Sequence, residues 1–202
     1  MVYNPKIHSR CSIRLKEYDY SAEGFYFVTF CTQGRECLLG KIAGDKMILN
    51  QLGYTAKYWW KKLFDKFENI NLDEFIIMPN HIHGIIKIVE NSIVGTNLCV
   101  RPNPDYHIPG EHLGRGEHIG LPLRNISRNN QYQRRRMLIP KIIGYFKMNS
   151  SKRINDIRGL AGNSVWQRNY YENIIRDEQV YNEFYSYIKN NPRTWDSDRN
   201  NI

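Results

Sequence analysis

Two histidines, His81 and His83, stand directly behind a turn signal and inside a run of β-branched residues. The turn signal is Pro79-Asn80, and the flanking residues 75–77 and 85–89 are rich in isoleucine, which predicts two strands joined by a tight turn. Side chains of a strand alternate between its two faces. The two histidines therefore point to the same face, about 7 Å apart by the strand rise, and the isoleucine between them points into the core.

Two imidazoles held on one strand offer half of a metal site. On spacing alone, strand pairs of this kind also occur by accident, and a pair of structural histidines hydrogen-bonded at a strand end is the alternative interpretation. A nucleotidyl hydrolase of the histidine-triad type would need a third histidine two residues further on. Ile85 stands there instead, which excludes that class.

The charge of the chain points to a polyanionic partner. The 202 residues carry a net charge of +9 and a pI near 9.4, which favours nucleic acid first and an anionic membrane surface second. No apolar run reaches the roughly 18 residues of a spanning helix, and residues 1–9 lack the apolar stretch of a signal peptide. The four cysteines form no CxxC pair, so we expect reduced thiols, a cytoplasmic location and no membrane partner.

The pattern along the chain predicts an α+β fold. Residues 25–32 are apolar at both parities, as in a strand covered on both faces, and residues 47–49 offer a second, shorter strand. Residues 52–67 have an apolar stripe and a lysine-rich outer face, so we expect an amphipathic helix. A further helix should contain Pro140 in its first turn. The last helix should start near Asp177-Glu178 and end by Asn191, because Pro192 follows.

Composition changes abruptly at residues 91–136. This stretch holds seven arginines against three acids and has no sustained period, so we expect a basic, flexible insertion in a single domain of residues 1–202. At its end, Arg134, Arg135 and Arg136 fit two interpretations, a solvated linker end and an arm that binds phosphates and orders on DNA.

The last helix places Tyr187 and Asn191 four residues apart, and hence on one face. A phenol and an amide oxygen in that register could face a metal held by the two histidines. Asn191 would then be a third ligand, and Tyr187 a nucleophile activated by a nearby cation or base. The alternatives stay open here: Tyr187 as a core aromatic, with Tyr181 and Tyr185 as substitutes, and Asn191 as an ordinary helix terminus.

Several segments, in order, resemble the single-tyrosine transposases of the IS200/IS605 type, and most closely the REP-associated tyrosine transposases. The central one is residues 77–83, Ile-Met-Pro-Asn-His-Ile-His, which is similar to the family's His-hydrophobic-His motif. The resemblance includes residues 12–20 and 30–33 before it, and residues 166–177 after it. It ends with Tyr187-Ile188-Lys189-Asn190-Asn191-Pro192. It covers most of the chain outside residues 91–136.

This resemblance implies a central antiparallel sheet flanked by helices, the ferredoxin-like fold of the HUH nucleases. It implies that His81 and His83 ligate Mg²⁺ or Mn²⁺, with Asn191 as a third ligand. It implies that Tyr187 attacks a DNA phosphate to give a 5′-phosphotyrosine link and a free 3′-hydroxyl. One departure is Asn173, where relatives often carry histidine after Glu172.

The expected function is therefore that of a DNA transposase that nicks and rejoins single-stranded or hairpin DNA. A non-catalytic, domesticated hairpin-binding protein of the same fold is the alternative, and the positive charge disfavours a metal hydrolase of small substrates. Both a homodimer and a monomer remain open. Besides the three arginines of the insertion, the candidates for contact with DNA phosphates are Arg14, Lys147, Arg168 and Arg176.

Overall fold

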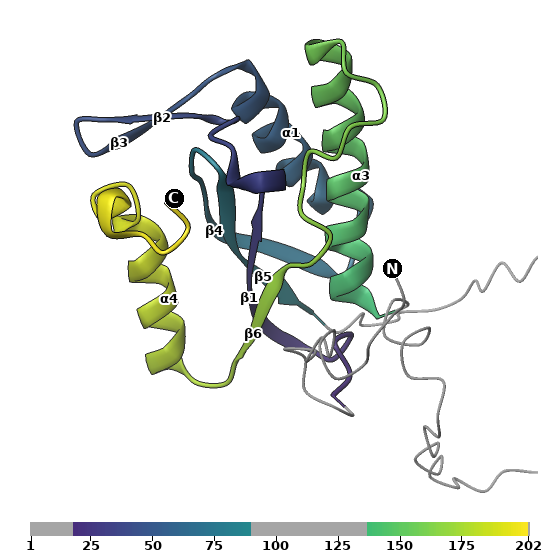
Figure 1. The fold of residues 1–202 in the computed structure, drawn as a ribbon. Helices are drawn as coiled ribbons and strands as arrows, with labels where there is room; N and C mark the ends of the chain where they lie inside the picture. Colours follow the sequence, from purple (N-terminus) through teal and green to yellow (C-terminus); the bar gives the residue numbers. More distant parts are fainter. Residues whose placement is uncertain (1–17, 90–136, 202) are drawn as a thin grey trace, which may run out of the picture.

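A four-stranded antiparallel sheet forms the centre of the computed structural model, which describes residues 18–89 and 137–201 (Figure 1). The strand order is β4-β5-β1-β6. The strands are β1 (Gly24–Cys31), β4 (Ile70–Ile77), β5 (His81–Ile88) and β6 (Tyr171–Ile175). The insertion at 91–136, Arg14 and Arg134 to Arg136 lie outside the described residues.

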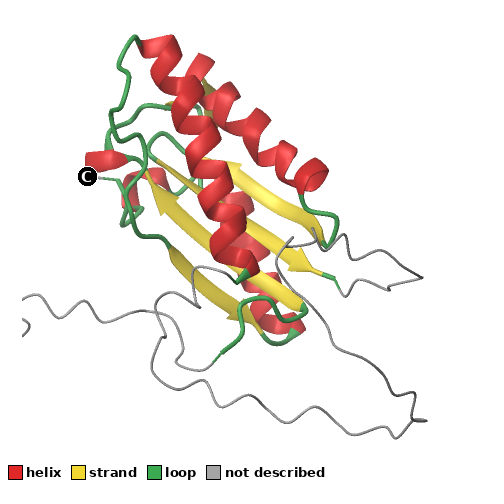
Figure 2. Cartoon of the chain, turned by 90° about the vertical axis from the view of Figure 1, so that its right-hand side faces the viewer, coloured by secondary structure: helices red, strands yellow, loops and turns green. Residues whose placement is uncertain are grey.

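Helices cover both faces of the sheet. The helices α1 (Gln51–Lys66) and α3 (Leu138–Arg158) lie together on one face, and α4 (Glu178–Asn190) lies alone on the other. Figure 2 shows the two long helices crossing their face of the sheet. This arrangement confirms the predicted α+β class with a central antiparallel sheet.

The central strand β1 is buried on both sides, as its continuous apolar sequence predicts. Tyr26, Val28 and Phe30 contribute to the core under α1 and α3, whereas Phe27 contributes to a second core under α4. Because β1 pairs with β5 on one side and β6 on the other, the strand that carries His81 and His83 lies directly beside it.

Strand β5 begins at His81, so both histidines lie on a strand, as predicted. Ile82 and Ile86 face α1 and α3, whereas His81, His83 and Ile85 have the opposite parity and face α4. Gly84 follows His83 in β5 and lies on the face of the sheet that α1 covers. A Cβ atom there would clash with the Trp60 ring, so glycine lets this ring pack directly on the backbone of β5.

The helix predicted over 52–67 is α1, with Asn50 as its N-cap: the Asn50 side chain accepts a hydrogen bond from the backbone N–H of Gly53 at 2.9 Å. Where the sequence predicted one short strand, the structure has a two-stranded hairpin, β2 (Gly40–Ala43) and β3 (Lys46–Leu49). The described residues also include two short 3₁₀ turns, Gln33–Arg35 and Trp195–Ser197. Within residues 18–89 and 137–201, no helix is long and apolar enough to cross a membrane.

The last helix, α4, starts and ends where the sequence predicts. Asp177 caps its N-terminus, accepting a hydrogen bond from the backbone N–H of Val180 at 2.8 Å, and the helix stops at Asn190, two residues before Pro192. Ile188 is fully buried against the sheet. The helix is therefore anchored through its C-terminal half, the half that carries Tyr187.

Candidate active site

The turn before His81 is buried, which is unusual for a connection between two strands. Met78 and Asn80 are inaccessible to solvent. Their backbone groups are satisfied internally: the Met78 N–H donates to the His81 carbonyl, and the Asn80 carbonyl accepts from both the N–H and the hydroxyl of Thr32. The backbone that leads into His81 and His83 is consequently fixed in the protein interior, unlike that of an exposed loop.

The Asn80 side chain fixes the tautomer of His81. Its amide nitrogen donates to the carbonyls of Arg35 (3.1 Å) and Asn200 (2.7 Å), so its oxygen faces His81 Nδ1 at 2.8 Å. His81 Nδ1 must then carry the proton. The lone pair is left on Nε2, a buried atom that has no hydrogen-bond partner among the described residues.

Thr29 orients His83 in a similar way. Thr29 of β1 lies directly opposite His83 of β5, and its hydroxyl is 2.6 Å from His83 Nδ1. When His83 Nδ1 carries its proton, the Thr29 oxygen accepts it and the lone pair is left on Nε2. The two imidazole centroids are 4.5 Å apart, so the two rings lie next to each other.

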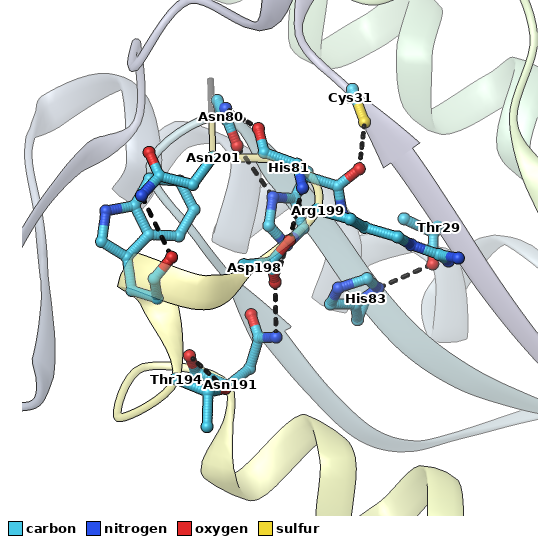
Figure 3. Close-up of polar contacts among 12 residues, drawn as sticks. Thr29, Cys31, Asn80, His81, His83, Asn191, Thr194, Asp198, Arg199 and Asn201 are labelled. Carbon is cyan, nitrogen blue, oxygen red and sulfur yellow. Dashed lines mark hydrogen bonds and ion pairs between the residues drawn. The ribbon is translucent and has the colours of Figure 1, made fainter.

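A carboxylate from the far end of the chain joins the two imidazoles (Figure 3). Asp198 Oδ2 lies 3.9 Å from His81 Nε2. The ligand atoms of His81, His83 and Asp198 all lie within 4.8 Å of one another, and Asp198 is only 9% exposed. Two neutral nitrogen ligands and one anionic oxygen form a group that can bind a divalent metal ion.

The segment that carries Asp198 is held in place by the histidine turn itself. The Asn200 carbonyl accepts from Asn80, and the Arg199 carbonyl accepts from Arg35 at 3.1 Å. Asp198 Oδ1 accepts from the backbone N–H of Asn200 at 2.6 Å. These bonds bring the C-terminal residues over the start of β5, and Asp198 therefore has a defined position before any ion binds.

Asn191 lies in the same cluster. Its amide nitrogen donates to Asp198 Oδ2 at 2.8 Å, which leaves its Oδ1 buried and without a hydrogen-bond partner in the described chain. The Asn191 side chain also raises the pKa of His81 and lowers the pKa of Tyr187. Two buried, unpartnered acceptors, His81 Nε2 and Asn191 Oδ1, are costly unless a ligand satisfies them. This pair of atoms is the observation that makes the cluster fit a metal ion.

Tyr187 reaches the cluster from α4. Its hydroxyl lies 3.2 Å from His83 Nε2, and the side chain is 36% exposed. Aromatic rings hold the helix at this depth: Phe184 stacks on Phe27 with centroids 4.2 Å apart, and Phe27 stacks on His83 at 5.4 Å. The helical register predicted from Tyr187 and Asn191 thus brings both side chains to the two histidines.

A bulge in β4 adds two polar contacts to α4. Between Leu72 and Phe75 the register with β5 shifts, so Asp73 and Glu74 are inserted opposite one position. Such a bulge re-aims side chains. The Tyr181 hydroxyl donates to Asp73 at 2.7 Å, and the Lys189 ammonium pairs with Glu74 at 2.9 Å. The helix that carries Tyr187 is therefore attached near both of its ends to the edge strand.

Burial keeps the two imidazoles of the cluster neutral. It lowers the pKa of His81 to about 4, although Asp198 raises it. Burial, His81 and Arg199 hold the pKa of His83 well below its ordinary value. Both imidazoles are consequently in the neutral form at neutral pH, as metal binding requires. Burial and Asp198 raise the pKa of the Tyr187 phenol, and Arg199 opposes them, so Tyr187 is a phenol in the metal-free protein.

A cavity of about 640 Å³ opens beside Tyr187. Its walls include three further aromatic residues, Phe27, Tyr171 and Phe184, together with Arg199. The Arg199 guanidinium lies over the Tyr171 ring, 5.7 Å from its centroid. Aromatic and guanidinium faces are the surfaces on which unpaired bases stack. The cavity can therefore accept a planar, charged group next to the phenol.

The described DNA-contact candidates lie outside this cluster. Lys147 on α3 donates to the carbonyls of Gln167 and Asn169, at 2.9 and 3.1 Å, and so holds the chain before β6. Arg168 and Arg176 are exposed, before and after β6. Their contact with DNA stays a prediction. The basic side chain that the fold brings to the cavity is Arg199, which the sequence did not single out.

Two members of the cluster escaped the sequence analysis. Asp198 lies in a short polar stretch, Trp-Asp-Ser-Asp-Arg-Asn, that has no period and no spacing relation to His81. Thr29 lies in an apolar strand, and only the register of β1 against β5 places it beside His83. The one available signal was the parity of Thr29, the only hydroxyl among the residues of β1 that face α4.

Comparison with known proteins gives one relative in sequence. A protein of Haemophilus influenzae (strain ATCC 51907 / DSM 11121 / KW20 / Rd), described as uncharacterized, is 40% identical over 197 residues, which cover 98% of this chain and 96% of its own length. No family model matches the chain.

Two solved structures are similar in fold. The structure of a REP-associated tyrosine transposase bound to a REP hairpin superposes with a TM-score of 0.50 and 15% identity, covering 91% of this chain and 74% of that one. At this identity the likeness establishes the fold alone. A putative transposase from Deinococcus radiodurans superposes with a TM-score of 0.42 and 12% identity, covering 89% of this chain and 97% of that one, a likeness too weak to argue from.

Proposed function

Because this chain belongs to one family with the Haemophilus influenzae protein and has the fold of the single-tyrosine transposases, we propose that it is a transposase of that type. It nicks and rejoins single-stranded DNA at a hairpin, and residues 1–202 form one such domain with a basic insertion. The observation that carries the proposal is the buried group of two imidazoles and a carboxylate, with the Tyr187 hydroxyl 3.2 Å from His83 Nε2.

In this proposal His81, His83 and Asp198 hold a divalent ion, Mg²⁺ or Mn²⁺, with Asn191 Oδ1 as a further ligand. Such an ion, when bound, supplies positive charge to the scissile phosphate. Asn80 and Thr29 hold the Nδ1 atoms of the two histidines, which would leave both Nε2 lone pairs available to such an ion, and burial keeps both rings neutral.

Tyr187 is the nucleophile. Its oxygen forms a bond to phosphorus, the bond from phosphorus to the 3′ oxygen breaks, and the phosphate stays on the 5′ side as a phosphotyrosine. The phenolic proton leaves to water, which the exposure of Tyr187 allows, and the departing 3′ oxygen takes up a proton. The Arg199 guanidinium at the cavity wall is placed to pair with phosphate oxygens. Arg14, Arg168, Arg176 and the arginines at 134–136 remain proposed DNA contacts.

Aromatic walls beside the nucleophile support an unpaired DNA substrate. A base next to the scissile phosphate can stack in the cavity formed by Tyr171, Phe184 and their neighbours only when it is released from a duplex. This is the reason for proposing cleavage in a single-stranded flank, with the hairpin stem recognised elsewhere.

The test is covalent capture. The protein is incubated with Mn²⁺ and a library of hairpins that carry single-stranded flanks, and adducts are resolved on a denaturing gel and mapped by peptide mass spectrometry. We expect an adduct on Tyr187, lost in Tyr187→Phe, whose affinity for the DNA stays within about twofold. Tyr185→Phe, two residues away on the same helix, is the matched control and keeps the adduct. An adduct that persists in Tyr187→Phe would move the nucleophile elsewhere.

The same experiment separates the alternative. Tight hairpin binding by the wild-type protein with no adduct at any metal concentration would favour a domesticated, non-catalytic hairpin-binding protein of the same fold.

A further inference from the structure

A groove lies on the side of α4 opposite the Tyr187 cavity. It consists of two hollows of about 780 and 380 Å³ that share Met47 and Ile76 in their walls. The first is lined by residues of the β2–β3 hairpin, of the edge strand β4 and of the end of α4 with the turn after it, and the second by residues of β3, β4 and α1. None of the groove residues belongs to the cluster around His81 and His83.

The groove is strongly basic. Lys46 and Arg193 line the first hollow, and Lys57 and Lys61 line the second. None of these four forms an ion pair with another described residue, so their charges are available to a ligand. A fifth cation, Lys189, pairs with Glu74. The only acid in the walls of either hollow is Asp45. A ligand that fits this surface carries several negative charges.

The floor of the groove is apolar. Met47, Leu49, Phe75 and Ile76 form it, and Phe75 and Ile76 belong to β4, which is an edge strand of the sheet. Phe64 is 57% exposed and follows Lys57 and Lys61 on one face of α1, at the i, i+4, i+7 spacing. Cations bordering apolar and aromatic surface suit a single-stranded nucleic acid, whose bases and phosphates are both accessible. A duplex offers this surface only phosphates.

The groove adjoins the candidate active site through the end of α4. Lys189, Asn190 and Arg193 line the groove, while Tyr187 and Asn191, interleaved with them in the sequence, face the histidines. A strand that passes around the Pro192 turn therefore runs from the Tyr187 cavity into the groove. We propose that this groove binds the single-stranded DNA that flanks the cleavage site. The identity of the ligand as DNA rests on the proposed function.

The test measures binding without metal, so that no cleavage can occur. Fluorescence anisotropy with a labelled oligothymidine of about 20 nucleotides, in a chelator, gives the dissociation constant as a function of salt. We expect the double variants K57A/K61A and K46A/R193A each to weaken binding about tenfold. Each should also reduce the slope of log affinity against log salt by about 1.4, since each phosphate contact on a single strand contributes about 0.7.

Lys141 and Lys152 on α3 supply the matched control, because K141A/K152A removes the same charge from an exposed surface outside the groove. It should bind within about twofold of the wild type, and circular dichroism checks that all variants fold. Wild-type binding by the groove variants, or no binding by the wild type at low salt, would overturn the proposal. Equal losses of affinity for a blunt duplex would overturn the assignment to a single strand. Larger losses of affinity for an extended peptide than for DNA would assign the open edge of β4 to a protein partner.

This result is independent of the covalent capture experiment. A Tyr187→Phe protein should show the same groove-dependent binding as the wild type. Groove-dependent binding without any adduct would therefore reject cleavage but support the groove as a DNA-binding surface. An adduct formed equally well by the groove variants would support cleavage but reject the groove as the binding surface for the flank.

Discussion

Replacing Asp198 by asparagine tests whether the carboxylate is the anionic member of the metal-binding group. Among the described residues, Asp198 is the one acid whose oxygen lies with the nitrogens of His81 and His83. Asparagine keeps the size of the side chain. Its oxygen can still accept from the backbone of Asn200, and the amide of Asn191 can turn over to accept from the new Nδ2. The metal-free fold should therefore survive the change.

The magnitude follows from linkage between binding and stability. A metal at about 100 times its dissociation constant stabilises the folded protein by about 2.7 kcal/mol, and in a domain of this size about 1 kcal/mol corresponds to a Tm change of about 2–4 °C. The wild-type Tm should thus rise by about 5–11 °C. Removing groups that merely orient ligands weakens metal binding by about 10–100-fold, so losing a charged ligand should cost at least about 100-fold.

At the same metal concentration, Asp198→Asn would sit near its own dissociation constant. The stabilisation then falls to about 0.4 kcal/mol, which corresponds to a Tm rise of about 1–2 °C. Differential scanning fluorimetry with and without MnCl₂, each from a chelated stock, measures both values. The control is Asp196→Asn, an exposed acid two residues earlier in the same turn, which should keep the full shift. A full wild-type shift in Asp198→Asn would refute the assignment.

Three further predictions concern the same group and its support. Thr29→Val should weaken Mn²⁺ binding by about 10–100-fold, because His83 Nδ1 loses its partner at 2.6 Å; calorimetric titration against Thr29→Ser measures it, and unchanged affinity in the valine variant would contradict the role. Burial lowers the pKa of His81 to about 4, so between pH 6.5 and 4 the unfolded chain binds more protons than the folded one, and the free energy of unfolding of the metal-free protein should fall as pH falls, by at most about 1.4 kcal/mol per unit from this residue. Urea denaturation at pH 7 and 5 should show this slope, and His81→Gln should reduce it; an unchanged slope in that variant would exclude His81 as its source. Gly84→Ala should lower the free energy of unfolding by about 1–3 kcal/mol, because the added Cβ clashes with the Trp60 ring; a thermal melt checks it, and a Tm equal to that of the wild type would mean that the Trp60 ring can move.

Local patterns in the sequence were sufficient to predict the elements around the site. The apolar run of residues 25–32, the isoleucine-rich flanks of Pro79-Asn80 and the stop at Pro192 each predict a boundary that the structure confirms, because strand parity, turn chemistry and helix termination act over a few residues. The apolar stripe predicted the helix α1 but not which of its rings is buried most deeply. Trp60 is buried completely, against Gly84.

Contacts between residues far apart in the sequence could not be predicted from those patterns. Asp198 is 117 positions from His81, and its place depends on hydrogen bonds from Asn80 and Arg35 to the backbone of the C-terminal residues. The bulge in β4 likewise became visible only from its pairing with β5. No periodicity connects such residues, since their contacts arise from the packing of separate elements.

The sequence by itself determined that two imidazoles share a strand face, that a phenol and an amide share a helix face, and that the chain is strongly basic. These properties follow from the periods of strand and helix and from composition. Only the tertiary structure decided that the two faces meet, that Asp198 completes the group, and that free cations gather along the groove beside β4. The physical reason is burial: packing α4 and the C-terminal turn onto the sheet removes water from His81 and His83, and this desolvation keeps the rings neutral and their lone pairs open to a ligand.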